Sequence, residues 1–313
     1  MKVSLVIPIY NEIDNIFPFY RRIISVFEVY TIIDYEIVFV NDGSSDDSLK
    51  SIVKLSEENE KVKYINFSRN FGHQLAITAG IDLASGDYIV IMDGDGQDPP
   101  ELIPELISVA ERGNDVVYAK RNERLGETWF KKITAKYYYR ILNKLTDVDI
   151  PLDTGDFRLI SKRVKDVLKT MPEKHKYLRG QIAWMGFNSD YVEFVREVRM
   201  SGETKFSFIK MVRFGLDGII GFSTSPLRFA MIMGFLVSIL SISLVFWAIY
   251  KYYVGSVIIG WTSLEVTVLF LGGVQLIAIG IIGEYLGRLS DNVKNRPSYI
   301  IKDTNIKDFG FFK

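Results

Sequence analysis

Short apolar runs alternate with stretches of helical periodicity along the first half of the chain. The apolar runs cover residues 3–10, 35–40, 62–67, 88–92 and 115–119, and helices are expected over about 13–30, 46–58, 73–84 and 101–112. Continuous β-branched runs separated by helices are typical of a parallel sheet that is covered on both faces. The pattern therefore predicts an α/β domain built on a mostly parallel sheet.

Polar residues follow each predicted strand. These clusters are Asn11-Glu12, Asn41-Asp42-Gly43, Ser68-Arg69-Asn70, Asp93-Gly94-Asp95 and Lys120-Arg121. Ligands of open parallel sheets bind beyond the carboxyl ends of the strands. We therefore expect these clusters to meet in one binding site.

Two long apolar runs follow the predicted domain. Residues 229–250 carry no charge over 22 positions, and another 18 uncharged positions lie between Glu265 and Glu284. At about 1.5 Å per residue, each run approaches the roughly 30 Å thickness of a bilayer core. The alternative is a pair of buried core helices.

Flanking charges predict how these runs would be oriented. Basic residues surround the two runs, whereas the loop between them carries only Lys251; the flanking ones are Lys205, Lys210, Arg213, Arg228, Arg288, Lys294 and Arg296. Positive charge favours the cytoplasmic side. Charged residues also interrupt the first 20 positions, which argues against a signal peptide. We expect a multi-pass membrane protein with the preceding domain and both termini in the cytoplasm.

Composition restricts the chemistry. The 313 residues include 38 Lys and Arg against 38 Asp and Glu, so the neutral chain is not expected to bind nucleic acid. There is no Cys, and His73 and His175 are the two histidines, which excludes thiol nucleophiles and multi-histidine metal sites. A metal would need oxygen ligands, which favours Mg²⁺ or Mn²⁺. Neither GxxxxGK[ST] nor a GxGxxG after the first strand is present, so any nucleotide must be held differently.

An acidic string follows the fourth predicted strand. Asp93 and Asp95 are two positions apart, and the string continues through Gln97 and Asp98 to Pro99-Pro100. Both carboxylates can reach one hard cation, which could bridge them to a diphosphate. The alternative is an acidic turn that caps the helix beginning at the prolines.

Several strings, taken in order, carry a resemblance to a known family. They are Ile7-Pro8-Ile9-Tyr10-Asn11-Glu12, Val40-Asn41-Asp42-Gly43-Ser44, Arg69-Asn70-Phe71-Gly72, the acidic string from Asp93 to Glu101, Thr154-Gly155-Asp156-Phe157-Arg158-Leu159, Gly202-Glu203-Thr204-Lys205-Phe206, Phe270-Leu271-Gly272-Gly273-Val274-Gln275 and Gly283-Glu284-Tyr285-Leu286-Gly287-Arg288. Together they resemble family 2 glycosyltransferases with the type A nucleotide-sugar transferase fold. They are most similar to the polyprenyl-phosphate (bactoprenol) glucosyl transferases of O-antigen modification, which are similar to dolichyl-phosphate mannose synthases.

The resemblance implies a nucleotide-sugar site. Pro8, Tyr10, Glu12 and Asp42 would surround the nucleobase and ribose, and Asp42 could accept the imide N–H of uracil. Asp93 would face the ribose or the sugar.

The resemblance also implies the reacting centre. Asp95 with Gln97 would hold the metal, and Asp156 would lie near the reacting carbon of the sugar, as a base or only as an orienting group. For Asp156 the alternatives are a helix cap or a partner for Arg158. His73, where many relatives have Lys, is most simply the first residue of a helix.

Basic residues are expected to meet phosphates. Arg199 and Lys205 would clamp phosphate groups and count among the catalytic residues, the alternative being a solvated loop. Four more would meet the lipid phosphate or anionic head groups, namely Arg121, Arg124, Lys131 and Lys132. Residues 129–145 and 206–222 mix basic and aromatic side chains, as interfacial helices do, although ordinary surface helices are equally compatible.

We therefore expect a cytoplasmic transferase domain over residues 1–205, an amphipathic segment over 206–225, a two-helix hairpin over 226–288 and a cytoplasmic tail over 289–313. The resemblance implies that the membrane is a bacterial plasma membrane. The expected reaction moves glucose from UDP-glucose to undecaprenyl phosphate with inversion. Other donors remain open: UDP-N-acetylglucosamine, UDP-galactose, a modified arabinose or GDP-mannose. A non-catalytic membrane protein that binds nucleotide sugars also remains an alternative.

A homo-oligomer and a flippase partner are both compatible with the sequence. The string Gln181-Ile182-Ala183-Trp184 lacks the Arg of processive synthases, which argues against a polymerase.

Overall fold

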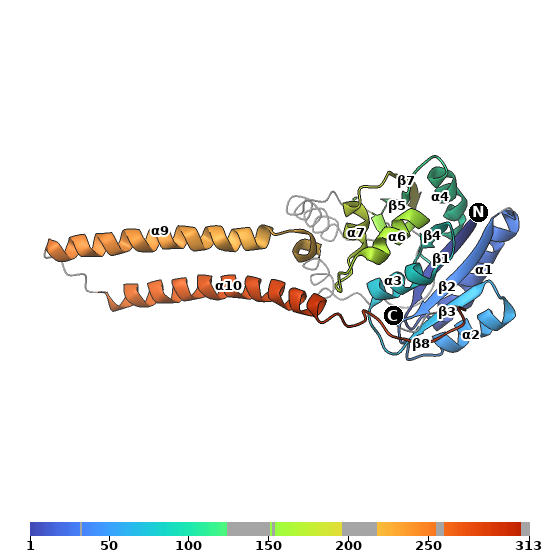
Figure 1. Ribbon diagram of the computed structural model, residues 1–313, viewed down its shortest axis with the longest axis horizontal. Coiled ribbons are helices and arrows are strands. Elements are labelled where there is room, and N and C mark those ends of the chain that lie inside the picture. Colours follow the sequence, from blue (N-terminus) through green and yellow to red (C-terminus); the bar gives the residue numbers. More distant parts are fainter. Residues whose placement is uncertain (32, 124–150, 152–153, 196–217, 255–259, 308–313) are drawn as a thin grey trace.

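The computed structural model describes residues 1–31, 33–123, 151, 154–195, 218–254 and 260–307 (Figure 1). Strands and helices alternate through the first part of the chain. They are β1 (Lys2–Ile9), α1 (Ile13–Val29), β2 (Asp34–Asn41), α2 (Ser48–Glu58), β3 (Val62–Phe67), α3 (His73–Leu83), β4 (Tyr88–Ile91), the 3-10 turn η1 (Pro100–Leu102), α4 (Ile103–Ala110) and β5 (Val116–Glu123). The order and the approximate bounds agree with the sequence pattern. The last predicted helix of that series is split into η1 and α4.

The second part of the domain completes the sheet. It contributes β6 (Thr154–Ser161), α6 (Lys162–Thr170), α7 (Leu178–Trp184), β7 (Ser189–Val195) and, near the end of the chain, β8 (Ile301–Thr304). The eight strands lie in the order β7-β5-β6-β4-β1-β2-β3-β8. β6 is antiparallel to both β4 and β5, and β8 is antiparallel to β3. The sheet is therefore mixed but mostly parallel, as predicted.

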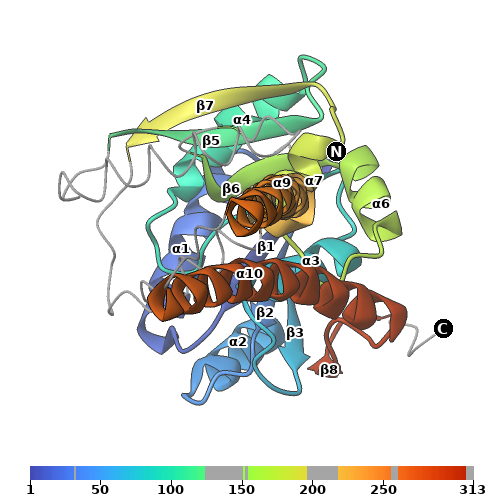
Figure 2. The same cartoon turned by 90° about the vertical axis from the view of Figure 1, so that its left-hand side faces the viewer.

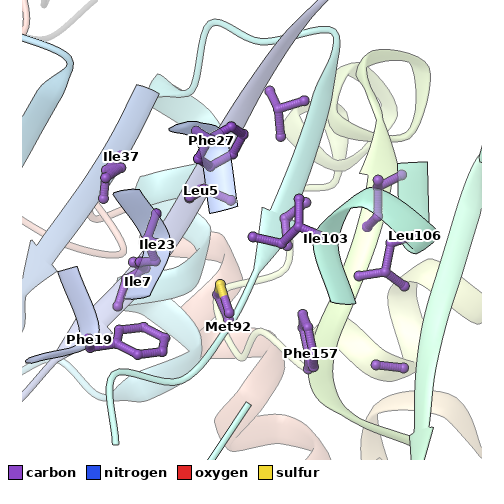
Figure 3. Close-up of a cluster of buried hydrophobic side chains, with 14 of the residues drawn as sticks. Leu5, Ile7, Phe19, Ile23, Phe27, Ile37, Met92, Ile103, Leu106 and Phe157 are labelled. Atoms are coloured by element: carbon purple, nitrogen blue, oxygen red, sulfur yellow. The ribbon is translucent and has the colours of Figure 1, made fainter. Parts of the chain in front are cut away.

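Helices cover both faces of the sheet and bury its apolar side chains. On one face, α1, α2 and α4 pack on alternate strand residues such as Leu5, Ile7 and Phe157 (Figure 3). On the other face, α3, α6 and α7 pack on the intervening residues such as Val6 and Ile160. Burial of both faces explains why the central strands read as continuous apolar runs.

Two long helices project from the domain, side by side (Figure 1). They are α9 (Ser225–Tyr253) and α10 (Trp261–Val293). The segments Ser225–Lys251 and Val266–Val293 are long and apolar enough to cross a membrane, with mean hydropathies of 2.5 and 2.3. None of their most apolar windows is buried against the rest of the described chain, which disfavours the alternative of core helices.

The segment after α10 returns to the domain and pairs with the edge of its sheet (Figure 2). The backbone of β8 pairs with β3, the Tyr299 ring stacks on Phe67, and Tyr299 donates to Asp82 at 2.8 Å. The end of the hairpin is thereby fixed to the domain from which the hairpin started. The hydrophobic pattern did not predict this strand.

Candidate active site

The carboxyl ends of β1 and β2 are tied together by hydrogen bonds of their loops. The amide of Asn11 donates to Ser44 Oγ at 3.0 Å, and Asn11 Oδ1 accepts from the amide of Ser45 at 2.7 Å. The amide of Glu12 donates to Ser48 Oγ at 3.0 Å. Among the predicted nucleotide-binding residues here, Tyr10 is exposed and Pro8 is buried within β1.

Asp42 organises the loop after β3. Its carboxylate accepts from the amides of Phe71 and Gly72 and from the Asn70 side chain, at 2.7–3.0 Å. Burial raises the pKa of Asp42, although the amides of Phe71 and Gly72 oppose that shift. The loop approaches so closely that a Cβ on Gly43, which has φ +66°, would lie 2.5 Å from the Arg69 backbone. Asp42 thus holds two of the predicted motifs together, its own and the one over residues 69–72.

The acidic loop after β4 concentrates buried carboxylates. The amide of Asp93 donates to Asp98 Oδ2 at 3.0 Å, and the amide of Gln97 donates to Asp95 Oδ1 at 3.1 Å. Asp95 is 7% exposed and Asp98 is fully buried. Burial and the nearby charge of Asp93 raise the pKa of Asp98 to about 7, and burial also raises the pKa of Asp93. Burial and mutual repulsion therefore both oppose full ionisation of this loop.

These residues fit a hard divalent cation whose coordination shell is completed by the substrate. In the described part of the chain, no group of three acidic or histidine side chains forms a metal cage. Yet the buried oxygens Asp93 Oδ1 and Asp98 Oδ1 accept no hydrogen bond there. Mg²⁺ is usually held by one or two carboxylates together with water and substrate phosphates. The loop matches that kind of site rather than a complete protein cage.

Asp156 lies at the same edge of the sheet because β6 runs antiparallel to β4. The beginning of β6 therefore meets the end of β4, with Arg158 opposite Ile91. Four side chains surround the Asp156 carboxylate: Arg179 Nε donates to Oδ1 at 2.9 Å, Arg158 Nη2 lies 3.4 Å from Oδ1, and His73 Nε2 and Gln74 Nε2 lie 3.2 and 3.3 Å from Oδ2. Burial alone would raise the pKa of Asp156. The charges of Arg179 and His73 and their hydrogen bonds hold that pKa well below its usual range.

His73 connects this carboxylate to the acidic loop. Its Nε2 lies 3.5 Å from Asp93 Oδ1 as well as 3.2 Å from Asp156 Oδ2. Burial opposes a charge on the ring, but the hydrogen bond to Asp156 and the charges of Asp93 and Asp156 raise its pKa to about 9. His73 does begin α3, as predicted. As an imidazolium between two carboxylates, it is also a residue of the site.

Arg121 reaches the same region from β5. A Cβ on Gly155 would lie 2.5 Å from Arg121 Nη2, so the guanidinium covers the backbone beside Asp156. The other basic residues predicted at the site all lie outside the described residues: Arg124, Lys131, Lys132, Arg199 and Lys205.

Sequence reasoning missed three side chains at Asp156. Gln74 was given no role, His73 was interpreted as a helix start in preference to a catalytic residue, and Arg179 beside the string at Gln181 was not considered. That string lacks an Arg at the position found in processive synthases, yet Arg179 on the same helix points to the site. An Arg two residues before Gln181 was the available signal. The predicted partnership of Asp156 with Arg158 is present in addition to these contacts.

Comparisons with known proteins agree with this architecture. Residues 4–168 match glycosyl transferase family 2. The chain is 47% identical over 303 residues to the uncharacterized glycosyltransferase YkcC of Bacillus subtilis (96% of this chain, 94% of the relative). It is 42% identical over 306 residues to the SfII prophage-derived bactoprenol glucosyl transferase of Shigella flexneri (97% of this chain, 99% of the relative).

A solved structure supports the fold. Glucosyl-3-phosphoglycerate synthase from Mycobacterium tuberculosis, in complex with Mn²⁺, uridine diphosphate and phosphoglyceric acid, aligns with a TM-score of 0.50 at 14% identity, over 70% of this chain and 76% of that one. The chain belongs to glycosyl transferase family 2, and it is a glycosyltransferase with the type A fold.

Proposed function

We propose that this glycosyltransferase transfers glucose from UDP-glucose to undecaprenyl (bactoprenol) phosphate, with inversion at the anomeric carbon. One observation carries the proposal: a type A transferase site and two exposed apolar helices share a chain that is 42% identical to a bactoprenol glucosyl transferase across 97% of its length. A hydrophobic hairpin beside a nucleotide-sugar site suits an acceptor that is itself a lipid. The product would be a polyprenyl-linked sugar for modifying cell-surface glycans.

The acceptor chemistry places few demands on the protein. A phosphate monoester has a second pKa of about 6, so its oxygen is already largely anionic at neutral pH. Transfer then depends mainly on positioning the two substrates and on stabilising the leaving diphosphate. A general base is not required, which leaves Asp156 free to act as an orienting carboxylate.

Asp95 and Gln97 are the residues that would hold Mg²⁺ or Mn²⁺. The bound ion would neutralise negative charge on the leaving diphosphate. Asp93 would face the ribose or the sugar, and Pro8, Tyr10, Glu12 and Asp42 would form the nucleotide side of the site. The loops after β1, β2 and β4 support this division because they converge at one edge of the sheet.

Basic residues would receive the phosphates at the membrane side. Arg121 is suited to this because its guanidinium lies over Gly155, next to Asp156. Arg199 and Lys205 would clamp phosphates, and three more would meet the lipid phosphate or anionic head groups, namely Arg124, Lys131 and Lys132.

The hairpin would anchor the enzyme in a bacterial plasma membrane with the catalytic domain in the cytoplasm. Support comes from the basic flanks of the apolar runs and from β8, which brings the chain after α10 back to the domain. Accessibility of tags in intact cells tests this orientation. A C-terminal tag that is reachable from outside while the N-terminal tag is protected would contradict it.

Release of UDP from UDP-glucose by the full-length protein in membranes, with Mn²⁺ and undecaprenyl phosphate, tests the reaction. We expect release that requires both the lipid and the metal, and an inverted anomeric configuration in the product by NMR. Parallel assays with the four alternative donors decide the sugar. Nucleotide-sugar binding without release of the nucleoside diphosphate (UDP, or GDP from GDP-mannose) from any donor would favour the non-catalytic alternative.

A further inference from the structure

The short helix α7 contacts the active site at one end. Its Arg179 donates to Asp156 Oδ1 at 2.9 Å, and the amide of Leu178 donates to Gln74 Oε1 at 3.2 Å. Gln74 in turn donates to the other oxygen of Asp156 at 3.3 Å. Both oxygens of this carboxylate are therefore held by groups that depend on the position of α7.

The same helix, α7, also contacts the segment that leads into the hairpin. The ring of Phe222, three residues before α9, packs so close to Gly180 that a Cβ there would lie 2.6 Å from the ring. The same ring lies 5.9 Å from that of Tyr177 between ring centroids. Gly180 directly follows Arg179, so the two contacts are on adjacent residues of one helical turn.

The second long helix, α10, holds the residue that follows Phe222. Tyr285 of α10 donates to the carbonyl oxygen of Ser223 at 2.6 Å. We call Phe222, Ser223 and Tyr285 the neck of the hairpin. The loop before α7 is also bound to the inner end of α10, because the amide of Lys174 donates to Asn292 Oδ1 at 3.0 Å.

We propose that Arg179 is a positioning residue for glycosyl transfer and that the neck of the hairpin holds it against Asp156 through Gly180 of α7. The proposal rests on the proposed function because it takes Asp156 to orient the reacting sugar. It adds that the membrane hairpin is part of the machinery that shapes the active site. An anchor alone would require no contact with α7.

The Arg179 side chain faces Asp156 rather than bulk solvent. The Asp156 side chain is 9% exposed and that of Arg179 is 19% exposed, so their ion pair is well shielded from water. Other charged groups face Asp156 from α3, β6 and β5, namely His73, Arg158 and Arg121. Removing Arg179 therefore leaves the carboxylate ionised but takes away the shortest of the hydrogen bonds that fix its orientation. Small displacements of a catalytic group can reduce a rate about a hundredfold.

Kinetics of full-length variants test both halves of this proposal, using whichever donor and acceptor the wild-type protein turns over. We expect Arg179→Gln to lower kcat roughly a hundredfold while the donor KM changes little. Arg179→Lys, which restores a cationic donor, should recover at least tenfold of that loss. Phe222→Ala should lower kcat roughly tenfold, and combining it with Arg179→Gln should add nothing, because the neck acts through Arg179.

Arg163→Gln is the matched control, since Arg163 pairs with Asp115 on an exposed surface away from the site. Retained UDP binding and an unchanged membrane fraction establish that each variant is folded and inserted. Three results would overturn the proposal: normal kcat in Arg179→Gln, a loss confined to donor KM, or an effect of Phe222→Ala that persists in full without Arg179. Failure of the wild-type protein to use undecaprenyl phosphate would instead count against the proposed function.

Discussion

Two groups of carboxylates meet at one edge of the sheet, and their electrostatic surroundings are opposite. The acidic loop of Asp93, Asp95 and Asp98 is buried, and burial together with the repulsion between its carboxylates raises the pKa values of Asp93 and Asp98 despite the nearby charge of Arg121. Asp156 is buried among Arg179, Arg158 and His73, and its pKa is lowered. We therefore propose that the protein neutralises one group itself and leaves the other to a ligand.

This difference separates two tasks that carboxylates can have in a transferase. An under-neutralised cluster attracts a divalent cation and, with it, a diphosphate. A carboxylate locked by its own cations stays ionised and fixed, which suits hydrogen bonding to sugar hydroxyls. His73 joins the two groups because its Nε2 lies within 3.5 Å of both Asp93 and Asp156.

The largest effect is expected from removing the cation site. Asp95→Ala should lower transfer at least about a thousandfold, because a bound metal contributes several kcal/mol of charge stabilisation at the leaving diphosphate. Steady-state assays with and without excess chelator measure this. Glu101→Gln, which alters an exposed ion pair with Arg22, is the control and should remain active. Full turnover of the wild-type protein in chelator would contradict the prediction.

Replacing Asp156, the carboxylate held by its own cations, should have a smaller effect on rate and a clear effect on stability. Asp156→Asn should lower kcat about a hundredfold. It should also destabilise the protein by about 3 kcal/mol, because the buried Arg158 would lose its counter-ion. Thermal unfolding, with the exposed Asp190→Asn as a control, provides the second measurement. Equal unfolding temperatures for Asp156→Asn and wild type would show that the cations do not depend on this carboxylate.

The smallest effect is expected on the unfolding temperature, from removing the charge of His73 between the two groups of carboxylates. The pKa of His73 is raised from about 6.5 to about 9 in the folded protein. Its charge therefore stabilises the fold fully below pH 6.5, and this contribution disappears as the pH rises through 9. The unfolding temperatures of wild type and His73→Gln should differ by a few degrees at pH 6 and converge by pH 9.5. A difference that is independent of pH would contradict the assignment.

The central fold was predictable because its signals are local. β1, β2 and β4 are mostly continuous apolar runs, β3 alternates, and all four are followed by polar residues. The helices between them have the expected period. β8 could not be predicted in this way, because it has four residues and its two central side chains are exposed. Its place is set by tertiary contacts, such as the stacking of Tyr299 on Phe67.

The same distinction applies to the site. Asp42, Asp93 and Asp95 could be anticipated from their places at strand ends, and Asp156 from its motif. Their surroundings could not, because Arg179 and His73 reach Asp156 from helices that are distant in sequence. The opposite pKa shifts of the two groups follow from those contacts, so they become visible only in the folded protein.

Calorimetric titration of the full-length protein with Mn²⁺ in the presence of UDP tests the central distinction most directly. Asp156→Asn should bind Mn²⁺ and UDP nearly as the wild-type protein does, although it turns over poorly. Asp95→Ala should lose the part of UDP binding that depends on Mn²⁺. Metal-dependent binding that survives in Asp95→Ala, or that is lost in Asp156→Asn, would contradict the division between a cation-binding loop and a carboxylate neutralised by the protein.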